Sequence, residues 1–172
     1  RHLDELVGRI HGAWGTLTAS PIHYLYRSIS PQQLVALYRT ADVMLVTALR
    51  DGMNLVAKEF VASRIDEDGV LVLSEFAGAA AELGEAVIIN PYDIDGVATA
   101  IAAALRMPRE ARTARMRVLR HRVTSWPVHR WADSFLAELD RRPAPSSSAA
   151  PPPVDVEALL GRIAAAPAVV LL

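Results

Sequence analysis

The chain has 172 residues, of which 52% are hydrophobic, enough for one globular unit with a sizeable core and too little for two full domains. Its 22% of charged residues nearly cancel to a formal net charge of -1, so no overall field attracts nucleic acid or an anionic membrane surface. Cysteine is absent, which excludes disulfides and thiolate chemistry. No apolar run is long enough to span a bilayer, so we expect a cytoplasmic protein without a membrane partner.

Helical and strand patterns alternate from residue 31 onward. Short apolar runs bounded by turns are typical of strands buried on both faces of a sheet. Proline favours the first turn of a helix, and apolar residues at helical spacing follow it. The expected elements are a helix from Pro31, a strand at 43–46, a helix at 55–64, strands at 70–73 and 86–89, and a helix at 93–107. This order predicts an α/β fold with a doubly wound parallel sheet.

Two further helical patterns follow. The first, residues 109–121, is rich in arginine but lacks the interleaved aromatic residues of RNA-binding segments, so we interpret it as a solvated helix face and expect no nucleic-acid partner. The second, residues 127–139, carries an apolar stripe that suits contact with a partner and is otherwise an exposed patch. The stripe consists of Val128, Trp131, Phe135 and Leu139.

Neither the histidines nor the first glycines form a binding motif. The histidines have no metal-ligand spacing, so we expect neither a metal site nor a cofactor. Gly8, Gly12 and Gly15 do not follow a strand in the dinucleotide-binding pattern and are interpreted as loop glycines. The histidines are His2, His11, His23, His121 and His129.

The most informative segment is Arg50 to Glu59. In doubly wound sheets the ligand site lies beyond the carboxyl ends of the strands, which points to residues 47–55 and 74–80. Gly52 can adopt a positive φ and Asn54 can cap the helix that follows, whose free amide groups suit a phosphate. Carboxylates before and within that helix could accept hydrogen bonds from sugar hydroxyls. An Asp-Gly turn before a helix is also ordinary turn chemistry, so on spacing alone a ligand site and a plain turn are equally open.

Several blocks, in the right order, resemble the trehalose-6-phosphate synthases, the retaining glycosyltransferases of family 20. The resemblance runs from about Leu6 to Leu139. The blocks are Pro21 to Ser28, Leu37 to Val43, Arg50 to Glu59, Ser74 to Ala80 and Asn90 to Asp93.

The resemblance implies the Rossmann-like C-terminal half of a GT-B glycosyltransferase, which binds UDP-glucose. The other half would bind glucose 6-phosphate, and transfer without a metal would give trehalose 6-phosphate and UDP. Asp51 would act at the reaction centre. The implied donor contacts are Asp51, Gly52, Met53 and Asn54 to glucose, the Leu55 and Val56 backbone to the diphosphate, Glu59 to ribose and the Ile29 main chain to the uracil.

Composition and resemblance together predict three segments. Residues 1–142 would be the donor domain, truncated on its N-terminal side; residues 143–153, rich in proline, serine and alanine, a disordered linker; and residues 154–172 the start of a trehalose-phosphatase domain of the HAD-like type. The diphosphate-neutralising cations and the acceptor pocket of the family would lie upstream, so this chain alone is expected to be inactive. Whether the phosphatase would be active stays open.

Other functions remain open at this point. A regulatory module that binds nucleotide sugars without catalysis, a GT-B transferase with another acceptor and a purely structural interaction module would share much of this pattern. The sequence also leaves open which base is preferred, because Ile29 would act through its backbone, and whether homo-oligomers form.

Overall fold

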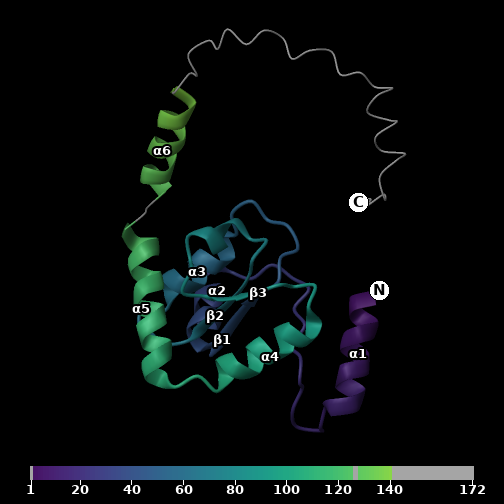
Figure 1. The fold of residues 1–172 in the computed structure, drawn as a ribbon. Helices are drawn as coiled ribbons and strands as arrows, with labels where there is room; N and C mark the ends of the chain where they lie inside the picture. The colour runs from purple at the N-terminus through teal and green to yellow at the C-terminus, as the bar shows by residue number, and fades with distance from the viewer. Residues whose placement is uncertain (1, 126–127, 141–172) are drawn as a thin grey trace, which may run out of the picture. The chain divides into compact units, whose positions relative to one another are not determined.

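The computed structural model describes residues 2–125 and 128–140 (Figure 1). The chain divides into two units, one up to Ser125 and one from Trp126. The predicted linker and the predicted start of a phosphatase domain lie outside the described residues. No helix in the described part of the chain is long and apolar enough to cross a membrane.

The first unit contains a parallel sheet of three strands in the order β1-β2-β3. Val43 pairs with Val70 and Val72 pairs with Val87, so successive strands run in the same direction. This confirms the predicted parallel α/β fold. The elements are α1 (His2–Trp14), α2 (Pro31–Thr40), β1 (Val43–Val46), α3 (Leu55–Ser63), β2 (Val70–Ser74), the 3-10 helix η1 (Gly78–Ala81), β3 (Val87–Ile89), α4 (Ile94–Leu105) and α5 (Arg109–Ser125).

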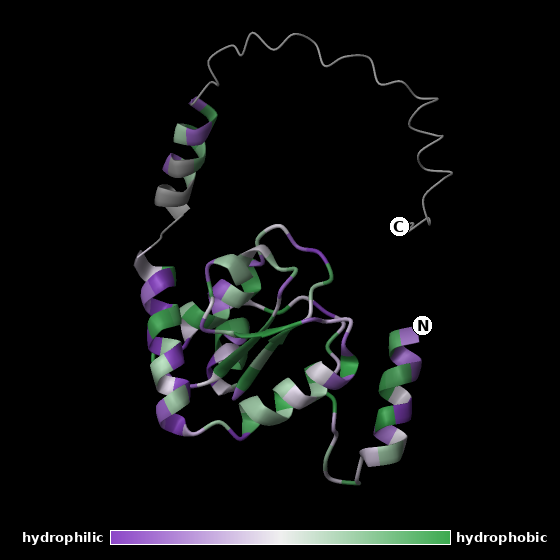
Figure 2. Ribbon diagram, viewed as in Figure 1, coloured by the Kyte–Doolittle hydropathy of each residue, from purple (hydrophilic) through white to green (hydrophobic). Residues whose placement is uncertain are grey.

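Both faces of the sheet are covered, which explains why the strand sequences are apolar without alternation (Figure 2). On one face Val70 and Val72 pack with Ala104 of α4. On the other, Leu71 and Leu73 join the core formed by α2, α3 and α5 (Figure 1). All five residues of β2 are buried, so the central strand anchors the position of the loops that leave the sheet.

Helix α5 is bound to the rest of the unit through its arginines, most of which also remain exposed, as the interpretation of a solvated face predicts. Two of its own residues, Met116 and Leu119, are buried. Partners of the arginines lie far away in the sequence, where a local pattern cannot reveal them. The contacts are Arg112 to Asp68 at 2.8 Å, Arg117 to Glu67 at 2.9 Å, Arg122 to Glu85 at 2.6 Å, Arg115 to the Glu85 carbonyl at 2.9 Å and Arg120 to the Val61 carbonyl at 3.0 Å.

The interpretation of the first glycines as loop residues is wrong for two of them. Gly8 and Gly12 lie inside α1, and Gly15 follows its last turn, where its N–H donates to His11 O at 2.8 Å. Glycine weakens a helix by only about 1 kcal/mol relative to alanine, so the surrounding helix-forming residues can outweigh it.

The second unit contains the predicted helix as α6 (Val128–Asp140). Of its predicted apolar stripe, the side chains of Phe135 and Leu139 are exposed.

A buried arginine joins the ends of α2 and α3. Only 5% of Arg64 is exposed, although it carries a charge. Its guanidinium donates to the carbonyls of Arg39 at 2.7 Å, Ala41 at 2.8 Å and Asp68 at 2.7 Å. Because the last carbonyls of a helix lack partners within it, Arg64 satisfies groups that would otherwise be unpaired away from water.

Replacing Arg64 with glutamine is expected to lower the free energy of unfolding by about 2–4 kcal/mol, because several buried carbonyls lose their donor. Chemical denaturation measures this change. The control is Arg109→Gln. The Arg109 side chain is 81% exposed, and its contact with Asp68 is long, at 3.9 Å. Equal effects of the two substitutions would contradict the role assigned to Arg64.

Candidate functional site

Two loops at the carboxyl edge of the sheet are joined through their backbones. Gly78 N–H donates to Asp51 O at 2.9 Å, and Ala79 N–H donates to Met53 O at 2.7 Å. The loop after β1 therefore lies against the residues that follow β2. The sequence assigns the expected ligand site to these two segments, and in the structure they lie side by side.

Gly78 is required at this junction. A Cβ atom at Gly78 would overlap the Gly52 carbonyl oxygen and lie 2.7 Å from its carbon and 3.1 Å from Met53 N. Only glycine permits so close an approach of two backbones. Sequence reasoning gave Gly78 no role of its own; the available signal was its place in a run of small residues directly after a buried strand.

The Asp51 carboxylate folds the loop back on itself. Its Oδ1 accepts hydrogen bonds from the N–H groups of Met53 and Asn54, both at 3.0 Å, and Oδ2 accepts one from the Asn54 side-chain amide at 2.9 Å. The Met53 N–H and then the Asn54 amide hold the pKa of Asp51 below its ordinary value. The carboxylate is therefore ionised at neutral pH, and it orders the residues that lead into α3.

Asn54 is the N-cap of α3, as predicted. Its side chain accepts from Ala57 N–H at 2.9 Å, and its own φ of 70° lies in the left-handed region. The prediction that Gly52 takes the positive φ is wrong: among the described residues, positive φ occurs at Asn54, Glu67 and Gly69. Asparagine tolerates this region better than most residues, and here the Asp51 carboxylate binds both its N–H and its amide.

The first turn of α3 begins with exposed residues. Leu55 and Val56 follow the cap directly, and their side chains are exposed. Amide groups in the first turn of a helix have no acceptor within it, and the helix dipole adds partial positive charge there. This end of α3 is therefore suited to an anion.

Glu59 lies one turn further along α3 and is exposed. The hydroxyl of Tyr38, a buried residue of α2, donates to its Oε2 at 3.1 Å. Burial, followed by the hydrogen bond and the charge of Glu59, raises the pKa of Tyr38 to about 12. Lys58, also on α3, contacts Glu82 at 2.7 Å, so its ammonium group is paired with a carboxylate.

Ile29 lies outside the joined loops, just before α2. The next residue, Ser30, caps α2 in a capping box with Gln33, in agreement with the predicted helix start. Helices α2 and α3 end together, because the Arg64 guanidinium binds the last carbonyls of α2.

Comparison with known proteins shows which family contains this site. The profile described as Glycosyltransferase family 20 matches residues 1–141. The chain belongs to glycosyltransferase family 20. It is 52% identical over 142 residues to the trehalose-6-phosphate synthase of Mycobacterium leprae, covering 83% of this chain and 28% of that protein. It is 53% identical over 139 residues to the bifunctional trehalose-6-phosphate synthase/phosphatase of Thermoproteus tenax, covering 81% of this chain and 19% of that protein.

Solved structures agree with this assignment. The alpha,alpha-trehalose-phosphate synthase (UDP-forming) of Burkholderia xenovorans in complex with glucose-6-phosphate matches with a TM-score of 0.77 and 48% identity, over 81% of this chain and 31% of that one. The E. coli trehalose-6-phosphate protein bound with UDP-2-fluoro glucose matches with a TM-score of 0.77 and 43% identity, over 82% and 32%. The predicted Rossmann-like half of a GT-B fold is thereby confirmed. The family 20 chain spans less than a third of the length of the curated relatives described above.

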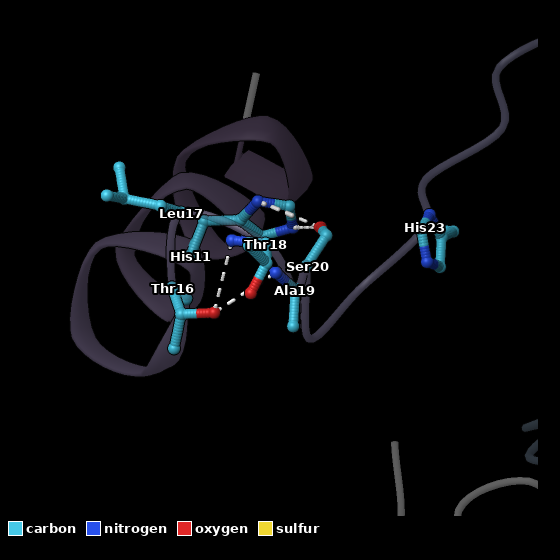
Figure 3. Close-up of a pocket in the computed structure, with 8 residues that line it drawn as sticks. His11, Thr16, Leu17, Thr18, Ala19, Ser20 and His23 are labelled. Carbon is cyan, nitrogen blue, oxygen red and sulfur yellow. Dashed lines mark hydrogen bonds between the residues drawn. The ribbon is translucent and has the colours of Figure 1, made fainter.

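A broad open hollow of about 720 Å³ lies elsewhere in the family 20 chain, at the end of α1 and the loop after it (Figure 3). The His11 ring bonds the Ile22 carbonyl at 2.8 Å, and Ser20 Oγ lies 3.3 Å from the same ring nitrogen. The residues that line the hollow include none of the predicted donor residues. The hollow is therefore distinct from the edge where the two loops meet.

Gly78→Ala is expected to destabilise the family 20 chain by roughly 1–3 kcal/mol, because the added methyl forces the two loops apart. Denaturant unfolding measures the loss. Gly84→Ala is the matched control, since a Cβ there meets nothing within 4 Å. A Gly78 variant as stable as the Gly84 variant would contradict the close packing of these loops.

The ionisation of Tyr38 provides a pH test. A phenol whose pKa is raised from 10.0 to about 12 in the folded state contributes stability that is complete below pH 10 and is lost as the pH rises through 12. Glu59→Gln is expected to lower this pKa without restoring the ordinary value, because burial, the largest cause, remains. Phenolate absorbance as a function of pH measures this pKa. Subtracting the titration curve of Tyr38→Phe isolates the contribution of Tyr38. An unchanged pKa in Glu59→Gln would contradict the contact.

Proposed function

We propose that this chain forms the UDP-glucose-binding half of a trehalose-6-phosphate synthase. In the complete protein it would transfer glucose with retention to glucose 6-phosphate, giving trehalose 6-phosphate and UDP. The observation that carries this proposal is the loop fixed by Asp51 and Gly78, which presents the start of α3 with the Glu59 carboxylate one turn further on. The names of the relatives support the reaction.

The diphosphate would bind at the start of α3. The N–H groups of Leu55 and Val56 belong to its first turn, where two negatively charged phosphates meet unpaired donors and the positive end of the helix dipole. Leaving-group charge on UDP would be stabilised at the same place. Groups already in position need no reorganisation as that charge develops, which favours the transition state.

The sugar rings would be held by carboxylates and loop backbone. Each carboxylate oxygen can accept about two hydrogen bonds, so Asp51 Oδ2, with one from Asn54, can take another from a glucose hydroxyl at the reaction centre. Gly52, Met53 and Asn54 would line the glucose from the loop. Glu59 would accept hydrogen bonds from the ribose hydroxyls, and the Ile29 main chain would contact the uracil.

Transfer would also require the groups that the resemblance places upstream in the family, the diphosphate-neutralising cations and the pocket for glucose 6-phosphate. We therefore expect residues 1–172 by themselves to bind the donor without transferring glucose. The predicted segments at 1–142, 143–153 and 154–172 belong to the same proposal, as do a metal-free reaction and a cytoplasmic location.

UDP is expected to bind the chain, and Glu59→Ala is expected to weaken binding by about tenfold to a hundredfold, because charged hydrogen bonds to the ribose are lost. Calorimetry measures the dissociation constants, with ADP and GDP as comparison ligands for the base. Glu110→Ala, at an exposed carboxylate in the first turn of α5, is the control and should bind UDP as the parent chain does.

If the chain alone gives no heat of binding, the titration is repeated with the chain joined to the upstream part of a family 20 enzyme, which would supply the diphosphate-neutralising cations and the acceptor half. Absence of UDP binding in that form would refute the donor site. The donor site would also be refuted if Glu59→Ala weakened UDP binding no more than Glu110→Ala does.

A further inference from the structure

One buried polar group next to the candidate site has no part in the proposed donor contacts. The side chain of Tyr38 comes from α2, and only 5% of the residue is exposed. Its hydroxyl donates to Glu59 Oε2 at 3.1 Å, across to the neighbouring helix α3. Within the described residues, the other oxygen of that carboxylate has no hydrogen-bond partner.

The ring of Tyr38 is fixed by its packing. Phe60 is fully buried and meets it edge to face, with ring centroids 6.2 Å apart and an interplanar angle of 81°. The Arg64 guanidinium lies over Phe60, 5.9 Å from the ring centroid, and donates to the Tyr38 carbonyl at 3.1 Å. The phenol hydroxyl therefore occupies a defined position beneath an exposed carboxylate.

Such an arrangement changes what a ligand must do to engage Glu59. An exposed glutamate samples several rotamers, and restricting them on binding costs entropy. A buried donor that already holds one carboxylate oxygen removes part of that cost. It also leaves acceptor capacity on both oxygens for a vicinal diol.

We propose that Tyr38 is a positioning residue for the ribose of the nucleotide: its hydroxyl fixes Glu59 Oε2 so that the carboxylate faces the two ribose hydroxyls before the ligand arrives. This inference rests on the proposed function, because it takes Glu59 as the ribose-binding group. Tyr38 itself does not touch the ligand. Its effect therefore depends on the presence of both Glu59 and the ribose diol.

A purely structural role would behave differently. If the bond between Tyr38 and Glu59 only ties α2 to α3, its loss changes stability and affects all nucleotides equally. A positioning role instead makes the loss specific for ligands that carry the diol. The comparison of UDP with its 2′,3′-dideoxy analogue separates the two roles.

The experiment uses whichever form binds UDP in the titrations above, the chain alone or joined to the acceptor half. Tyr38→Phe keeps the ring and removes only the hydroxyl, and is expected to weaken UDP binding roughly threefold to tenfold. Binding of the dideoxy analogue should change less than about twofold. Tyr92→Phe is the matched control, the same change at an exposed tyrosine.

A double variant completes the test. Because Tyr38 acts through Glu59, adding Tyr38→Phe to Glu59→Gln should weaken UDP binding no further than Glu59→Gln alone. Equal losses for UDP and the dideoxy analogue, or an unchanged UDP affinity in Tyr38→Phe while Glu59→Gln weakens binding, would overturn the positioning role and leave the proposed function standing. No UDP binding in either form, or no effect of Glu59→Gln, would overturn the proposed function and this inference with it.

Discussion

The candidate site depends on the close approach of two backbones, the Gly52 carbonyl and Gly78. Because no side chain stands between them, Gly78 N–H can reach Asp51 O, and the loops after β1 and β2 become one unit. With its main chain fixed, Asp51 can direct its carboxylate to the next residues and hold Asn54 in the left-handed conformation that caps α3. The orientation of the first turn of α3 thus follows from a contact between two glycines.

The far end of α3 is fixed by a different interaction. The charged Arg64 is buried where α2 and α3 end, and it binds carbonyls that the helix geometry leaves unpaired. Glu59 lies between the cap and this anchor. An exposed carboxylate is thereby carried on a helix held at both ends, which is how a surface group can keep a defined position.

The fold was predictable to the extent that its signals are local. Strands buried on both faces appear as unbroken apolar runs, and the rule that ligands bind beyond the carboxyl ends of strands selects two loops that the structure joins. Properties decided by distant partners were not predictable. Gly52 and Asn54 can both adopt positive φ, and only the three-dimensional position of the Asp51 carboxylate selects Asn54. The hydroxyl of Tyr38 contacts Glu59 of another helix. In the sequence, Tyr38 is only one of the apolar positions at helical spacing.

The proposed donor site would tolerate substitutions at some positions and not at others. In the proposed donor site, the uracil and the diphosphate are contacted through the main chain at Ile29, Leu55 and Val56, where the identity of the side chain matters little. When a ligand is recognised through backbone groups, the residues that hold that backbone in place become the ones whose identity matters. Gly78 and Arg64 would touch no ligand, yet substitutions there should disturb nucleotide binding more than substitutions at Leu55 or Val56, since a displaced amide cannot be replaced by a neighbouring side chain.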